Sequence, residues 1–196
     1  MYKKLAWAVS IILEPFALVS LAWLFSILSL EEPLRNKLLW LFTFLVVSGL
    51  PPVLILIYER RVGKISNWFM TNRVERKDVE IAWLLGSLVL FSLLFLSNAP
   101  RLLLALGLAT LLISFALATI NTFWKVSFHM VGITFLTLVM VLVYSPVFLW
   151  LAIFLPLLAW ARVLLGHHTL TQVTVGTLLT VVITLGSFAV FNLFTL

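Results

Sequence analysis

Long apolar runs follow one another along almost the whole chain, with only short polar segments between them. A helix needs about 20 consecutive apolar residues to cross the hydrocarbon core of a bilayer. Only 10% of the 196 residues are charged, against roughly 25% in a soluble domain whose surface faces water. We therefore predict an all-α fold, a polytopic membrane helix bundle with six to seven transmembrane helices. The expected spans are 5–30, 38–58, 81–97, 102–123, 130–144, 147–165 and 170–195.

The first apolar run follows Lys3 and Lys4 and extends from Leu5 to Leu30. It is longer than the apolar part of a signal peptide and has no small-x-small cleavage site at its end, so we expect a retained first span. No long polar segment separates the spans. Residues 1–196 are therefore expected to form a single transmembrane domain, with N-terminal spans in 1–58 and the main polar clusters in 59–196.

The basic residues favour one side of this expected bundle. Seven spans place the N-terminus and the segments 59–80, 124–129 and 162–169 on one side, which then holds ten of the thirteen Lys and Arg residues. Cytoplasmic loops carry an excess of these residues, so we expect this side to face the cytoplasm across a plasma or inner membrane. Membrane topology also accounts for the net charge of +6, and no nucleic-acid partner is expected.

Three polar clusters lie on this side and contain all three histidines: residues 64–76, 124–129 and 162–172. Ionisable groups at membrane depth are costly and are usually paired or functional. Lys, Arg and Ser side chains are suited to holding a phosphate. Two histidines can divide the work of nucleophile and general acid. The clusters therefore predict one pocket that handles a phosphate group.

The third cluster contains a candidate orienting residue. If a helix begins near Thr169, His168 and Gln172 are four residues apart and lie on one face. The Gln172 carbonyl would then accept the ring N–H of His168 and fix the tautomer of the imidazole.

The spacing of this cluster resembles the type-2 phosphatidic acid phosphatase (PAP2) superfamily, which includes lipid phosphatases and vanadium haloperoxidases. The third motif of that family is Ser-Arg, five residues, His, three residues, Asp. Ala161, Arg162, His168 and Gln172 keep this spacing with two substitutions.

The other two motifs of the family match less closely. Its second motif, Pro-Ser-Gly-His, is similar to Val126-Ser127-Phe128-His129, which keeps Ser and His. Its first motif, Lys, six residues, Arg-Pro, has a loose analogue in Lys64 with Arg73 or Arg76. The resemblance covers roughly residues 60–190.

The resemblance implies a lipid phosphatase that works through a phospho-histidine, with no metal or organic cofactor. Its substrate would be a lipid phosphomonoester or an isoprenyl diphosphate, drawn from the surrounding membrane lipids. His168 would be the nucleophile and His129 the acid that protonates the leaving oxygen. The residues expected to hold the phosphate are Lys64, Arg73, Arg76, Lys125, Ser127 and Arg162.

Two departures from the family pattern favour a second interpretation. Phe128 replaces a glycine and Gln172 replaces a carboxylate, which predicts a weaker, differently tuned or inactive enzyme. The alternative is a non-catalytic membrane protein that binds or transports a lipid phosphate.

Several single residues have more than one interpretation. Arg162 could extend to the lipid headgroups, and Lys125 is either a headgroup contact or a phosphate contact. His167 has no role in the motifs and is expected at the membrane interface. Glu14 lies within the first span and should face a partner. A metal site is not expected, because the rings of adjacent histidines point apart and no carboxylate cluster accompanies them.

Overall fold

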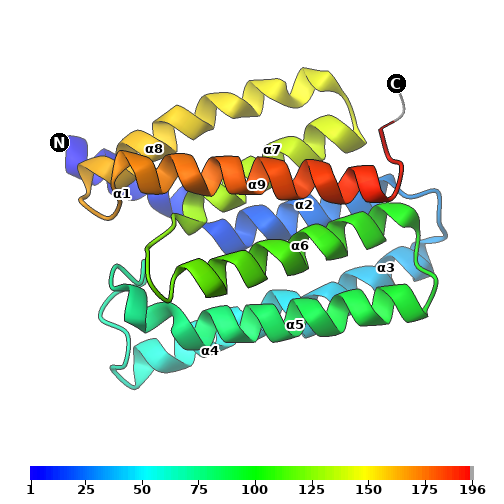
Figure 1. Cartoon of the computed structure of the whole chain (residues 1–196), viewed down its shortest axis with the longest axis horizontal. Helices are drawn as coiled ribbons and strands as arrows, with labels where there is room; N and C mark the ends of the chain where they lie inside the picture. The colour runs from blue at the N-terminus through cyan, green and yellow to red at the C-terminus, as the bar shows by residue number, and fades with distance from the viewer. Residues whose placement is uncertain (195–196) are drawn as a thin grey trace.

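The computed structural model describes residues 1–194, which form an all-α bundle. Most helices run side by side along the long axis of the molecule (Figure 1). The α-helices are α1 (Tyr2–Ile12), α2 (Pro15–Ser29), α3 (Leu34–Phe44), α4 (Leu50–Arg61), α5 (Lys77–Leu96), α6 (Arg101–Ile120), α7 (Phe128–Val143), α8 (Phe154–Leu164) and α9 (Leu170–Val190). A π-helical segment, η1 (Leu45–Gly49), joins α3 to α4, and 3-10 segments η2 (Arg73–Arg76) and η3 (Pro146–Ile153) precede α5 and α8.

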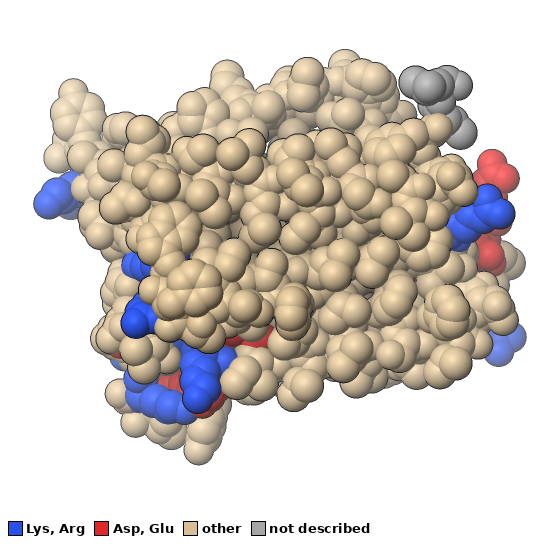
Figure 2. Space-filling view, in the orientation of Figure 1, with Lys and Arg blue, Asp and Glu red and all other residues tan. Residues whose placement is uncertain are grey.

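The described chain contains six helical segments that are long and apolar enough to cross a membrane. Helix α7 is also apolar but has only 16 residues. Charged side chains gather at the two ends of the bundle and leave the middle of the visible face almost free of them (Figure 2). The predicted bundle of six to seven helices is therefore confirmed. The six segments are Tyr2–Ser29, Leu34–Arg61, Arg73–Leu96, Arg101–Ile120, Pro146–Leu164 and Leu170–Val190.

The first span is broken, whereas the sequence predicts one uninterrupted run over 5–30. Helix α1 ends at Ile12 and α2 begins at Pro15. Proline has no N–H and keeps the preceding residue out of the helical region, and Glu14 is accordingly extended, with φ −65° and ψ 129°. The Glu14 carboxylate accepts a hydrogen bond of 2.8 Å from the N–H of Ala17. The partner that the sequence requires for Glu14 is thus the start of α2.

This break changes the hydrogen bonding of the last turn of α1. Because Leu13 leaves the helical region, with φ −99° and ψ 47°, the N–H of Glu14 does not continue the helical ladder back to Ser10. The Ser10 carbonyl instead accepts a hydrogen bond of 3.1 Å from Nε2–H of His129 in α7. An unpaired carbonyl in hydrocarbon costs several kcal/mol, so this bond ties the first span to α7.

Helix α7 lies at the centre of the bundle, with 12 of its 16 residues buried. It packs against α2, α8, α9 and η3. The closest approach is at Gly132, where an added Cβ would lie 2.9 Å from the Cα of Pro15. Glycine at this position lets the kink of the first span rest directly on α7, one turn away from His129.

We expect Gly132→Ala to destabilise the protein, because the new methyl group would meet backbone atoms that cannot move aside freely. Overpacking of this kind costs about 1–3 kcal/mol. Gly186→Ala is the matched control, since an added Cβ there has nothing within 4 Å, and alanine favours a helix. Thermal unfolding in detergent should show a lower Tm for the first variant and an equal or higher Tm for the second. Equal effects at both positions would contradict the close contact at Pro15.

Candidate functional site

Three connecting segments meet at the end of the bundle that holds the N-terminus (Figure 1). They are the α4–α5 loop (62–72), the α6–α7 connection (121–127) and the α8–α9 turn (165–169). The Nζ of Lys125 joins all three, because it donates hydrogen bonds to the carbonyls of Thr71 at 2.5 Å and His167 at 2.6 Å. The three polar clusters of the sequence are therefore neighbours in space.

The α8–α9 turn sets the spacing between Arg162 and His168. Helix α8 ends in a Schellman motif, in which the N–H of His167 bonds to the Arg162 carbonyl at 3.1 Å and the N–H of Gly166 to the Val163 carbonyl at 2.9 Å. This motif requires a left-handed residue after the helix, and Gly166 supplies it with φ +70°. The turn brings His168 back beside the last turn of α8, where its own N–H bonds to the Arg162 carbonyl at 3.3 Å.

Arg162 is completely buried, and the structure gives its guanidinium no hydrogen-bond partner among the described residues. All three side-chain nitrogens, Nε, Nη1 and Nη2, lack an acceptor. The group lies over the ring of Phe69, 4.9 Å from its centroid. A cation–π contact of this kind offsets only part of the cost of burying a charge. Arg162 is therefore a strong candidate for binding an anion.

His168 and Ser127 add further unpaired groups. Both ring nitrogens of His168 and the hydroxyl of Ser127 are buried without a hydrogen-bond partner among residues 1–194. Ser127 stands at the N-cap of α7, yet its side chain makes no capping bond. Burial, with the nearby charges of Arg76, Lys125 and Arg162, lowers the pKa of the His168 imidazole far below its ordinary value. The imidazole is therefore neutral at pH 7 and has a free lone pair.

Arg76 and Lys125 bring positive charge to the site while bonding to backbone carbonyls. Arg76 donates from Nε to the Met70 carbonyl and from Nη1 to the Val126 carbonyl, both at 2.9 Å. Its guanidinium also lies 5.0 Å from the centroid of the Phe128 ring. Burial and the charges of Arg76 and Arg162 lower the pKa of Lys125 to about 8. The loops thus hold these cations without neutralising them.

The rings of His129 and His167 both pack against the ring of Phe69, with centroid distances of 5.8 Å and 5.4 Å. Because the Ser10 carbonyl can only accept, the hydrogen of His129 is on Nε2, and Nδ1 is the atom left for chemistry. The pKa of His167 is lowered to about 4 by burial and by the charges of Arg162, Lys125 and Arg76. Sequence reasoning did not select Phe69, because nothing in an isolated phenylalanine indicates a position between three ionisable groups.

Two residues predicted to hold the phosphate, Lys64 and Arg73, do not join this cluster. Lys64 forms ion pairs with Glu59 and Asp78 instead. Arg73 donates to the backbone carbonyls of Asn121 and Thr122. Lys64 and Arg73 therefore bind partners outside the cluster that surrounds Arg162.

Gln172 makes a different hydrogen bond from the one expected. Its Oε1 accepts the backbone N–H of Thr169 at 3.1 Å, and the Thr169 hydroxyl accepts the N–H of Gln172 at 3.3 Å. These two bonds form a capping box at the start of α9. The helix therefore begins where the sequence predicts, but Gln172 completes its cap rather than orienting His168.

A buried carboxylate behind the site holds the α6–α7 connection in place. Glu80 accepts a hydrogen bond of 2.8 Å from the Asn121 amide, whose carbonyl oxygen accepts the N–H of Val126 at 3.0 Å. Val126 is thus fixed through its N–H by Asn121 and through its carbonyl by Arg76. This support determines where the next residue, Ser127, presents its hydroxyl. Residue types alone could not reveal it, because Glu80 and Asn121 are 41 positions apart.

Comparisons with protein-family models, with curated proteins and with solved structures found no match for this chain. Residues 1–194 contain no group of three or more His, Asp or Glu residues arranged to hold a metal ion.

Arg162→Met and Arg76→Met should change stability in opposite directions when no anion is present. Replacing the unpaired buried charge of Arg162 by an apolar side chain should raise the free energy of unfolding by about 1–4 kcal/mol. Replacing Arg76 leaves two carbonyl acceptors without a donor and should lower it by about 1–3 kcal/mol for each. Denaturation in detergent measures both. A loss of stability in Arg162→Met similar to that in Arg76→Met would show that Arg162 serves the fold rather than a ligand.

Anion affinity should depend on pH through Lys125. With its pKa lowered to about 8, Lys125 is charged below pH 8 and neutral above it. Sulfate keeps its charge in this range. The affinity of the protein for sulfate should therefore fall by about tenfold as the pH rises through 8, because neutral Lys125 no longer makes one charge-assisted hydrogen bond. Titration of sulfate binding by the parent, Lys125→Gln and the exposed control Lys77→Gln tests this. Only Lys125→Gln should lack the step; a step that persists there would exclude Lys125 as its source.

Proposed function

We propose that the chain is a membrane-embedded phosphatase that hydrolyses a lipid phosphomonoester or an isoprenyl diphosphate through a phospho-histidine. The buried, unpartnered guanidinium of Arg162 beside the unpartnered imidazole of His168 carries this proposal. A phosphate group has the charge and the acceptor oxygens that this guanidinium lacks in the protein, and planar Arg binds such groups through paired hydrogen bonds.

The surrounding groups support a phosphate better than a carboxylate. Arg76, Lys125 and Arg162 supply three positive charges around His168, and each of them lowers the pKa of its imidazole. Ser127 adds a hydroxyl directly before α7, where the helix dipole and the first backbone N–H groups also favour an anion. A phosphoryl group has more oxygens and more negative charge to share among these donors.

In the proposed reaction, a ring nitrogen of neutral His168 attacks the phosphorus atom. The P–N bond forms as the P–O bond to the lipid breaks, and the basic residues stabilise the charge spread over the phosphoryl oxygens. The negative charge of the bound substrate favours a second proton on His129, at Nδ1. Nδ1 gives this proton to the departing oxygen, while Nε2–H stays on the Ser10 carbonyl. Water then attacks phosphorus, His129 takes up its proton, and cleavage of the P–N bond releases inorganic phosphate and restores His168.

Two observations favour the non-catalytic alternative, a membrane protein that binds or transports a lipid phosphate. Gln172 caps α9, so the described residues provide no side chain that orients the His168 ring. Phe69 lies against Arg162 and must yield some of that space to a phosphate. Both features suit binding, and neither helps a nucleophile.

Phosphate release by membrane vesicles distinguishes the two proposals and tests the expected cytoplasmic location of the site. Inside-out vesicles given farnesyl diphosphate or dioleoyl phosphatidic acid should release phosphate, with or without a chelator. His168→Ala and His129→Ala should each lower the rate by at least about 100-fold. Right-side-out vesicles should be much less active, because an added charged substrate does not cross the bilayer.

The controls separate catalysis from binding. Lys64→Gln removes a cation that lies outside the site and should keep the parent rate. Well-folded parent protein that binds these lipids but releases no phosphate would favour the binding or transport alternative. Equal activity from both faces of the membrane would contradict the proposed orientation.

A further inference from the structure

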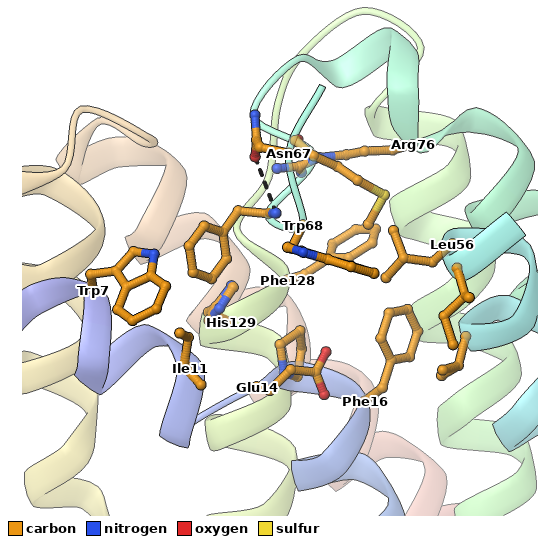
Figure 3. A pocket seen from close by; sticks show the side chains of 15 residues that line it. Trp7, Ile11, Glu14, Phe16, Leu56, Asn67, Trp68, Arg76, Phe128 and His129 are labelled. Atoms are coloured by element: carbon orange, nitrogen blue, oxygen red, sulfur yellow. Dashed lines mark hydrogen bonds between the residues drawn. The ribbon is translucent and has the colours of Figure 1, made fainter. Parts of the chain in front are cut away.

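A cavity of about 530 Å³ lies directly beside the basic cluster, within the range of roughly 300–1,000 Å³ that is usual for ligand sites. It is enclosed by α1, the start of α2, α4 and the α4–α5 loop (Figure 3). Aromatic side chains form much of its wall, including Trp7, Phe16, Trp68 and Phe128. Most of the lining belongs to residues 7–57, the part of the chain that lies outside the PAP2 resemblance.

The cavity and the phosphate site share several residues, among them Arg76. His129 lines the cavity, and so does Phe69, whose ring separates it from Arg162 and His167. In the proposed reaction His129 protonates the leaving oxygen, which must therefore lie at this border. The part of the substrate that carries the leaving oxygen then extends away from Arg162 and into the cavity.

The wall donors without a hydrogen-bond partner among residues 1–194 are Nη2 of Arg76 and the indole N–H groups of Trp7 and Trp68, whose side chains are more than half exposed. The Asn67 amide already donates to the hydroxyls of Ser66 and Thr71, and Nε and Nη1 of Arg76 donate to carbonyls. Glu14, whose carboxylate is part of the wall (Figure 3), only accepts hydrogen bonds when ionised. Ester carbonyls next to the phosphate, as in a diacylglycerol phosphate, would lose their water and could regain a hydrogen bond only from these few donors.

From these observations we infer that the cavity binds a single hydrocarbon chain attached directly to the phosphate oxygen, as in a monoprenyl or monoalkyl phosphate. This inference rests on the proposed function, because the role of His129 places the leaving group at the cavity. It selects one class among the lipid phosphates that the basic cluster alone would accept. The wall suits such a chain, since most of the side chains that line it are apolar or aromatic.

Binding of phosphonates tests the inference without any need for turnover, because their C–P bond does not hydrolyse. Farnesyl phosphonate should bind the purified protein at least about tenfold more tightly than the phosphonate of dioleoyl phosphatidic acid, the effect of one poorly satisfied carbonyl. Val53→Trp fills the cavity from α4 and should weaken the binding of farnesyl phosphonate by about tenfold or more. Its affinity for inorganic phosphate should stay within about twofold, because the basic cluster is untouched.

Leu54→Trp is the matched control, since Leu54 neighbours Val53 but is 59% exposed and faces away from the cavity. It should leave both affinities unchanged. Ile11→Trp repeats the test from the opposite wall, with Ile12→Trp, at a residue 76% exposed and outside the cavity, as its control. The two pairs keep the test decisive even if one tryptophan disturbs the fold, which the Tm of each variant would reveal.

The outcomes separate the two proposals. If inorganic phosphate still binds and neither cavity-filling variant changes the affinity for farnesyl phosphonate, only the inference that the cavity binds a hydrocarbon chain would be overturned. Tighter binding of the diacyl phosphonate would do the same. No binding of inorganic phosphate by folded parent protein would overturn the proposed function and the inference with it.

Discussion

A bilayer offers no water to backbone groups, so each carbonyl in the span must find a donor within the protein. The first span breaks that rule locally, because its helix is interrupted between Ile12 and Pro15 and the Ser10 carbonyl is released from the helical ladder. His129 restores the missing hydrogen bond, and Gly132 allows the broken segment to approach α7 closely enough for that bond to form. The kink, its contact with the central helix and the hydrogen bond of His129 are consequences of the same constraint.

The electrostatics of the site follow a second pattern. Arg76 and Lys125 are held by backbone carbonyls, which fix their positions and leave their charge in place. The nearby carboxylates are engaged elsewhere, with Lys64 on the outer side of the loop and Asn121 behind it. The cluster therefore stays positive although acidic residues are close in sequence.

The sequence predicts the spans well because the length of an apolar run decides whether a helix can cross a bilayer. It also predicts that 64–76, 124–129 and 162–172 share one end, since the number of spans between them fixes the side. The partner of each side chain is harder to predict. Lys64 lies between Glu59 and Asp78, and Thr169-Leu170-Thr171-Gln172 is a capping-box pattern. These two local patterns predict the observed partners of Lys64 and Gln172 better than the motif spacing of the PAP2 family does. The position of Phe69 and the Glu80–Asn121 bond depend instead on tertiary packing, which no local pattern encodes.

The bond between Ser10 and His129 joins residues 119 positions apart in the chain. During synthesis, the first span is made well before α7. The Ser10 carbonyl therefore has no hydrogen bond from His129 until residue 129 has been added. Once α7 lies beside the first span, this hydrogen bond can form. The α8–α9 turn, which completes the site, is made later still. The last turn of α1 is therefore fixed to α7 only after at least 129 of the 196 residues have been made.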